Sequence, residues 1–170
     1  MNLLARLFRS QPDPREALRP LWHRVVEISR EPEWYEQGGV ADTVAGRFDM
    51  ITAVLSLALL RLERDGECAP QCALLIELFV EDMDGQLRES GVGDIVVGKH
   101  IGKLMASLGG RLGAYRAALA GEGSFEDALR RNVTFVEGRG PEALAERLLA
   151  LRRQLDASAA GEVLAGAIAR

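Results

Sequence analysis

The sequence contains little of what catalytic and metal sites usually need. Its 170 residues include two histidines and two cysteines. Cys68 and Cys72 form one CxxxC pair and lack the second ligand pair of a zinc site, which predicts two reduced thiols. His23 and His100 stand beside no nucleophile motif, so a catalytic triad is not indicated, and haem ligation by either is a minor alternative. We expect no enzyme and no cofactor.

Positive charge in excess and long apolar runs are also missing. The formal net charge is −4 and the isoelectric point is near 5.3, which argues against nucleic-acid binding, because that needs a basic surface. The longest largely apolar run, Met50 to Leu60, is short of the about 20 residues that cross a bilayer. The sequence therefore predicts neither a nucleic-acid partner nor a membrane span.

Residues 1–12 are interpreted as an N-terminal amphipathic arm, separate from a domain over residues 13–170. The arm carries two arginines and no acid up to Ser10. It is suited to packing on its own domain, to lying on a membrane surface, or to beginning a targeting signal, and the first is favoured. The apolar residues that would make a peripheral membrane contact are Leu3, Leu4, Leu7 and Phe8.

Residues 13–170 show the apolar spacing of helices throughout. Caps and breakers such as Asp13-Pro14, Gly38-Gly39, Gly66 and Pro141 divide the apolar stripes from one another. No strand-like alternation is convincing, so we predict an all-α fold, a single compact multi-helix domain. The predicted helices cover approximately residues 14–30, 32–37, 43–65, 70–90, 94–120, 125–136 and 141–157, with a last alanine-rich helix capped by Ser158. The apolar helix over 43–65 is expected to be central and buried.

The helix over 94–120 is long and glycine-rich. Small residues follow one another along it at steps of three or four, and each interior glycine costs about 0.5–1 kcal/mol relative to alanine. Such a ridge needs compensation from the close approach of another backbone. Packing inside this domain is favoured, and a smooth groove for a client helix is the alternative. The ridge consists of Gly98, Gly102, Ala106, Gly109, Gly113 and Ala117.

An acidic face precedes this helix. Glu77, Glu81 and Asp84 lie one turn apart, which would suit a metal ion, but the Glu-x-x-His pairs of helical dimetal sites are missing. An ion pair between Asp84 and Arg88, at i and i+4, is the simpler interpretation.

Several short motifs together resemble the ubiquinol-cytochrome c chaperone family, over approximately Leu21 to Asn132. They are Ser29-Arg30-x-Pro32-x-Trp34-Tyr35, Gly39-Val40-x-Asp42-Thr43-x-x-Gly46-Arg47-Phe48-Asp49, Glu81-Asp82-Met83-Asp84, Leu87-Arg88-Glu89, Gly91-Val92-Gly93-Asp94, Val97-Gly98-Lys99, Gly110-Arg111, Ala114-Tyr115 and Arg131-Asn132.

The resemblance implies a noncatalytic, all-helical assembly chaperone that binds newly made cytochrome b and supports assembly of the ubiquinol-cytochrome c reductase complex (respiratory complex III). Composition suggests a bacterial protein, so we expect a cytoplasmic location, peripheral at the inner membrane, or the mitochondrial matrix if the chain is eukaryotic. The alternatives are a general helical adaptor between soluble proteins and a hydrolase or metal enzyme that uses the acidic face.

The polar residues of these motifs are the candidate partner-binding surface. Their alternative role is structural, as helix caps and interhelical ion pairs, and for Asp42 and Asp94 the two roles weigh equally. The candidates are Asp42, Arg47, Asp49, Glu81, Asp82, Asp84, Arg88, Asp94, Lys99, Arg111 and Tyr115.

Overall fold

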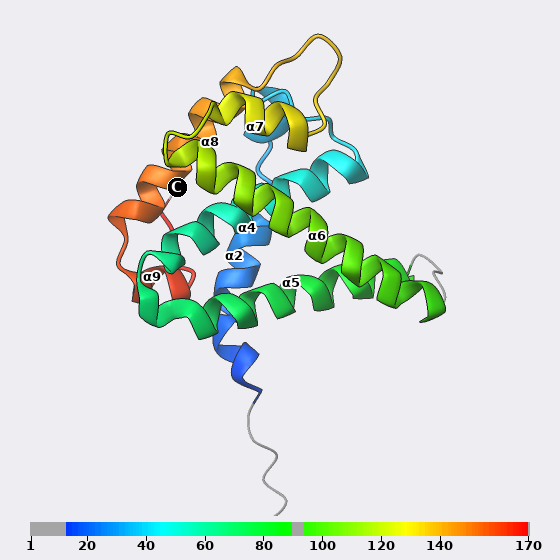
Figure 1. Cartoon of the computed structure of the whole chain (residues 1–170), viewed down its shortest axis with the longest axis vertical. Coiled ribbons are helices and arrows are strands. Elements are labelled where there is room, and N and C mark those ends of the chain that lie inside the picture. The colour runs from blue at the N-terminus through cyan, green and yellow to red at the C-terminus, as the bar shows by residue number, and fades with distance from the viewer. Residues whose placement is uncertain (1–12, 90–93, 170) are drawn as a thin grey trace, which may run out of the picture.

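The predicted all-α fold is confirmed (Figure 1). The computed structural model of the protein describes residues 13–89 and 94–169, and the side chains within these ranges except those of residues 87–100. In chain order, the helices are η1 (Pro14–Leu18), α2 (Arg19–Ser29), α3 (Glu33–Glu36), α4 (Val44–Glu63), η2 (Gly66–Cys68), α5 (Ala69–Glu89), α6 (Asp94–Leu119), α7 (Phe125–Asn132), α8 (Glu142–Ala157) and α9 (Ala160–Leu164). The predicted arm at residues 1–12 lies outside the described residues.

Helix α4 is the centre of the domain, as its sequence predicts. It packs against α2, α5, α6, α8 and α9, and every residue from Asp49 to Leu59 is buried. Its interior hydroxyls are satisfied locally, because Thr52 donates to the Phe48 carbonyl at 3.0 Å and Ser56 donates to the Thr52 carbonyl at 2.7 Å. A helix that is apolar on all sides must be enclosed by other helices, and this one is.

Two tryptophans fix the N-terminal helices. Trp22 on α2 packs edge-on against Phe79 of α5, with the ring centroids 6.0 Å apart. Trp34 on α3 is fully buried, and its indole N–H donates to the Ile28 carbonyl at 2.5 Å. The first contact fixes α2 against α5 and the second fixes α3 against the end of α2; α2 also packs against α4.

The C-terminal end of α5 and the N-terminal end of α6 lie at the same end of the molecule (Figure 1). Leu108 and Tyr115 of α6 are buried, but Gly102, Gly109 and Gly113 face solvent, and a Cβ atom added at any of these three would meet nothing within 4 Å. The favoured prediction of close packing inside the domain is therefore wrong for these glycines. The surroundings of Gly98 lie outside the described part of the structure.

Two predicted boundaries need correction. Helix α7 ends at Asn132 instead of continuing through Val136, because residues 133–136 are extended and pair with residues 39–41. The Ala41 amide donates to the Thr134 carbonyl at 2.9 Å, and the Val136 amide donates to the Gly39 carbonyl at 3.0 Å. The β-branched residues at 133, 134 and 136 favour this extended backbone.

The second correction concerns the last helix. Ser158 ends α8 instead of capping α9, and its amide donates to the Leu155 carbonyl. The N-cap position of α9 is Ala159, whose amide donates to the Glu162 carboxylate at 2.9 Å.

Two glycine-to-alanine substitutions should have opposite effects on stability. A Cβ atom at Gly46 would overlap the Ala41 carbonyl oxygen, so Gly46→Ala should lower the free energy of unfolding by about 1–3 kcal/mol. Gly109→Ala, on the open face of α6, should raise it by about 0.5–1 kcal/mol. Urea denaturation followed by circular dichroism measures both, and a destabilising Gly109→Ala would contradict the exposed position of this glycine.

Candidate functional site

The innermost of the predicted site residues form a buried ion pair. Asp49 on α4 and Arg111 on α6 are 2.6 Å apart, with 7% and 14% of their side chains exposed. The second carboxylate oxygen of Asp49 accepts hydrogen bonds from the Thr134 amide at 2.9 Å and the Thr134 hydroxyl at 2.8 Å. Both oxygens are thus satisfied within the domain, and the pair joins α4, α6 and the segment after α7.

Arg111 makes further contacts that hold its guanidinium in place. Its Nε donates to the Asn132 carbonyl at 3.3 Å, and another nitrogen donates to the Ser107 hydroxyl. The guanidinium carbon lies 5.5 Å from the centre of the Phe48 ring, within cation–π range. Arg111 therefore supports the face of α4 that carries Phe48.

Tyr115 is also internal. It is 1% exposed and packs edge-on against Phe125 at 5.5 Å between ring centroids. Burial raises the pKa of its hydroxyl above the usual value, and the hydroxyl forms no hydrogen bond to a described residue. For Asp49, Arg111 and Tyr115 the structure gives a role in the domain's own packing, and their contact with a partner stays a prediction.

Asp42 and Arg47 form an exposed pair at the start of α4. Arg47 Nε donates to the Asp42 carboxylate at 2.6 Å, and this hydrogen bond holds the pKa of Asp42 below its usual value. The N-cap of α4 is the neighbouring Thr43, whose hydroxyl accepts from the Gly46 amide at 3.2 Å. Asp42 is therefore not the cap, and its charge serves the ion pair.

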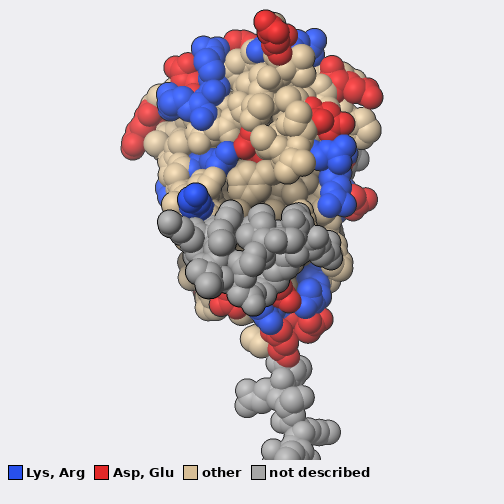
Figure 2. Space-filling view, turned by 90° about the vertical axis from the view of Figure 1, so that its right-hand side faces the viewer, with Lys and Arg blue, Asp and Glu red and all other residues tan. Residues whose placement is uncertain are grey.

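An apolar groove opens beside this pair, between α4, α5 and α6. Its volume is about 830 Å³. We use the name apolar groove for the surface formed by Val44, Phe48, Ile51, Met83 and Leu104. Val44 is 88% exposed, which is unusual for a valine on a folded domain. In Figure 2 an uncharged area on this side of the molecule lies between Lys and Arg side chains.

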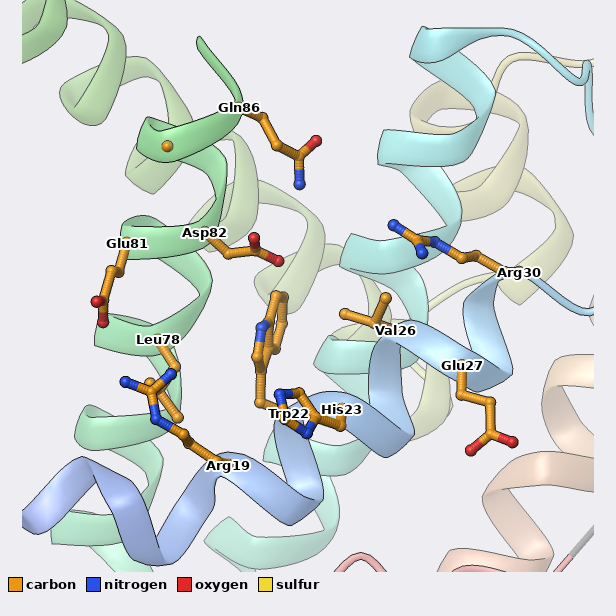
Figure 3. Close-up of a pocket in the computed structure, with 11 residues that line it drawn as sticks. Arg19, Trp22, His23, Val26, Glu27, Arg30, Leu78, Glu81, Asp82 and Gln86 are labelled. Atoms are coloured by element: carbon orange, nitrogen blue, oxygen red, sulfur yellow. The ribbon is translucent and has the colours of Figure 1, made fainter. Parts of the chain in front are cut away.

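A second hollow, of about 890 Å³, lies between α2 and α5 (Figure 3). We use the name charged cleft for the surface formed by Arg19, His23, Glu27, Glu81 and Asp82, over a floor of Trp22, Val26 and Leu78. Glu81 pairs with Arg15 at 3.2 Å, Arg19 with Glu16 at 2.7 Å and Glu27 with Arg24 at 2.8 Å. Asp82 points into the cleft and makes no ion pair with a described residue.

The remaining candidates lie towards the end of the molecule where α5 meets α6. Asp84 is half-buried on α5. Arg88, Asp94 and Lys99 are on α5 and α6, but their side chains lie outside the description, as does that of His100. The predicted ion pair between Asp84 and Arg88 therefore stays a prediction.

The structure brings together Arg47, Glu81 and Asp82 on one side of the domain, around two hollows that the sequence did not indicate. The apolar lining residues were missed as a surface because they follow the same helical spacing as the core. One signal was available: Val44 immediately follows the cap residue Thr43, so it begins a helix where backbone and side chain often remain open to solvent.

The two cysteines and the acidic face offer little chemistry. Cys68 and Cys72 are buried free thiols, and burial together with the nearby Glu63 raises the pKa of Cys72 to about 11. Among the described side chains, those of residues 13–86 and 101–169, no three from His, Cys, Asp or Glu lie together as a metal ion would require. No helix of this part of the chain is long and apolar enough to cross a membrane.

Comparison with known proteins identifies the class. The family model of the ubiquinol-cytochrome C chaperones matches residues 36–169. The chain therefore belongs to the ubiquinol-cytochrome c chaperone family, which indicates an assembly chaperone role. The match extends through α8 and α9, beyond the segment whose motifs carry the resemblance in the sequence.

A solved structure agrees with this assignment. The chain is similar to the Cbp3 homolog from Brucella abortus, whose crystal structure superposes with a TM-score of 0.77. The two sequences are 30% identical, and the alignment covers 98% of this chain and 95% of that one. No curated protein sequence matched the chain.

Breaking the buried ion pair should destabilise the whole domain. Asp49→Asn removes the charge that compensates Arg111 and should lower the free energy of unfolding by about 3–5 kcal/mol. Arg47→Ala, which breaks the exposed pair with Asp42, is the control and should change stability much less. Chemical denaturation measures both variants. Equal losses would show that the Asp49–Arg111 pair is no more important than a surface pair.

The Cys72 thiol should be unreactive in the folded protein. With a pKa of about 11, the thiolate is on the order of one part in a thousand at pH 8, so iodoacetamide should label Cys72 far more slowly in native than in urea-unfolded protein. Since the unfolded pKa is about 8.5, the contribution of this thiol to stability is complete below pH 8.5 and is lost as the pH rises towards 11. Mass spectrometry of the labelled peptide gives the rate, and equal native and unfolded rates would contradict the burial.

Proposed function

We propose that this protein is a noncatalytic assembly chaperone that binds newly made cytochrome b and thereby supports assembly of the ubiquinol-cytochrome c reductase complex. Membership of the chaperone family supports the assembly role, and the apolar groove is the observation that carries the binding step. In a bacterial cell the binding would take place in the cytoplasm beside the inner membrane, and in a eukaryote in the mitochondrial matrix. The arm residues 1–12 are proposed to assist by peripheral membrane contact.

The apolar groove supports this proposal because it is suited to a hydrophobic segment that waits for its place in a membrane. Val44, Phe48, Ile51, Met83 and Leu104 come from three different helices, so a bound segment would contact α4, α5 and α6 together. Each Å² of apolar surface removed from water contributes about 25 cal/mol, so a segment filling such a groove gains several kcal/mol before its ordering costs. Cytochrome b, as an integral membrane protein, exposes such segments before it assembles.

Two features support the interpretation that the protein binds a client without catalysing a reaction on it. Arg111 contacts both Phe48 and Ser107, so it links two lining residues of the groove that come from different helices. The ionisable residues among the described lining of the groove, Arg30, Arg47 and Lys103, are cations, which do not supply the paired acid and base of hydrolytic sites.

The second candidate is a general helical adaptor, because an apolar groove also accepts the apolar face of an amphipathic helix from a soluble protein. The two candidates differ in what depends on the protein. An adaptor for soluble proteins leaves cytochrome b unchanged when it is lost.

The first test measures spectroscopically intact cytochrome b in membranes of cells that lack the protein, with the transcript measured in parallel. We expect cytochrome b to fall at normal transcript level and to recover when the gene is restored. Unchanged cytochrome b would remove the proposal in favour of the adaptor.

A surface variant ties this result to the apolar groove. Val44→Asp places a carboxylate at the first position of α4, where the helix dipole tolerates it, so folding should be kept while the groove loses an apolar edge. Restoration with Val44→Asp should recover at most about half of the cytochrome b. The matched control is Val136→Asp, which changes an exposed valine outside the groove and should restore fully. Full recovery with Val44→Asp would place client binding elsewhere.

A further inference from the structure

We propose that the apolar groove and the charged cleft form one continuous site that accepts a client segment in one direction only. An apolar helical stretch lies in the apolar groove, and a flank bearing Lys or Arg lies in the charged cleft. The inference rests on the proposed function, since it takes the client to be a membrane protein, and it adds which chemical feature of the client is recognised.

The two hollows share part of their lining. Arg30, at the end of α2, and Gln86, on α5, line both the apolar groove and the charged cleft. In Figure 3 these two side chains project from separate helices at the end of the cleft that lies away from Arg19. A segment that leaves one hollow between Arg30 and Gln86 therefore enters the other.

The two ends of this continuous site differ in charge. Apart from Arg30, which lines both hollows, the described charged residues of the apolar groove are Arg47, which pairs with Asp42, and Lys103, which forms no ion pair with a described residue. In the charged cleft, the carboxylate of Asp82 is directed into the opening, and the exposed Glu81 lies one residue before it on α5. The chain thus presents the unpaired Lys103 beside the apolar end and the unpaired carboxylate of Asp82 at the other.

This arrangement fits one orientation of a membrane segment. The cytoplasmic flanks of transmembrane helices are enriched in Lys and Arg, so an apolar stretch emerging on this side of a membrane carries positive charge at its end. With that flank beside Asp82, opposite charges meet. With the segment reversed, the flank would lie beside Lys103, where like charges repel and disfavour binding.

The test uses the purified protein and two fluorescent peptides with the same Leu/Ala run, one carrying lysines at one end only and the other carrying glutamates at that same end. Fluorescence anisotropy should show about fivefold tighter binding of the lysine-flanked peptide, the magnitude expected of a few partly exposed charge pairs, and this preference should shrink at high salt. Asp82→Lys should remove or reverse the preference. Asp82→Asn, a milder change, should reduce it.

A matched control is Glu146→Lys, which reverses an exposed acid on α8, away from both hollows and without an ion pair to a described residue. Its preference should equal that of the unchanged protein, and circular dichroism verifies that each variant is folded. The direction is tested with a photo-crosslinker on the lysine-bearing end, which should label α2 and α5 around the charged cleft. Labelling of the Val44–Arg47 turn would overturn the proposed direction.

Equal binding of both peptides, or a preference that Asp82→Lys leaves unchanged, would overturn the inference. If cytochrome b still depends on the protein in cells, the proposed chaperone function stands in that case and only the charge recognition fails. If neither peptide binds and cytochrome b does not depend on the protein, both fail. Preferential adsorption of the protein to vesicles of anionic phospholipid, abolished by Lys103→Glu and accompanied by no peptide binding, would assign this face to a membrane surface and also overturn the inference.

Discussion

The ion pair between Asp49 and Arg111 is the constraint on which the arrangement of the domain depends. Removing a carboxylate from water costs several kcal/mol, and this cost is offset only when all of its hydrogen-bonding capacity is used. Asp49 achieves this with Arg111 on one oxygen and with the amide and hydroxyl of Thr134 on the other. Helix α4, helix α6 and the segment after α7 must therefore be assembled together, because a partial arrangement leaves a buried charge uncompensated.

The same pair supports the surface proposed to bind a client. Arg111 lies over the ring of Phe48 and contacts Ser107, and both of these residues line the apolar groove from different helices. Arg111 thus holds part of the groove's lining in place through its contacts with two helices. A preformed apolar surface needs little ordering when a client binds, so more of the burial energy is available for holding the client.

Local rules predicted most of the helices, because caps and breakers act within a few residues of one another. Asp13, Thr43, Ser124 and Pro141 each stand at the helix start that the sequence indicated. The same rules failed after Asn132, where residues 133–136 bond to residues 39–41, far away in the sequence. They also misjudged the glycines of α6, since small residues at helical spacing are compatible with close packing and with an open face alike, and only the position of the neighbouring helices distinguishes the two.

The sequence by itself determined the all-α class, the central place of α4 and, through its motifs, the family. Apolar periodicity and caps are properties of short segments, and motifs can be recognised without coordinates. Only the tertiary structure decided that Asp49, Arg111 and Tyr115 lie inside the domain while Arg47, Glu81 and Asp82 lie beside two hollows. The reason is that the sequence pattern around an acid or arginine in a helix is the same whether its side chain is exposed to water or pairs with a residue on another helix. Its exposure is set by the packing of segments that are distant in the chain.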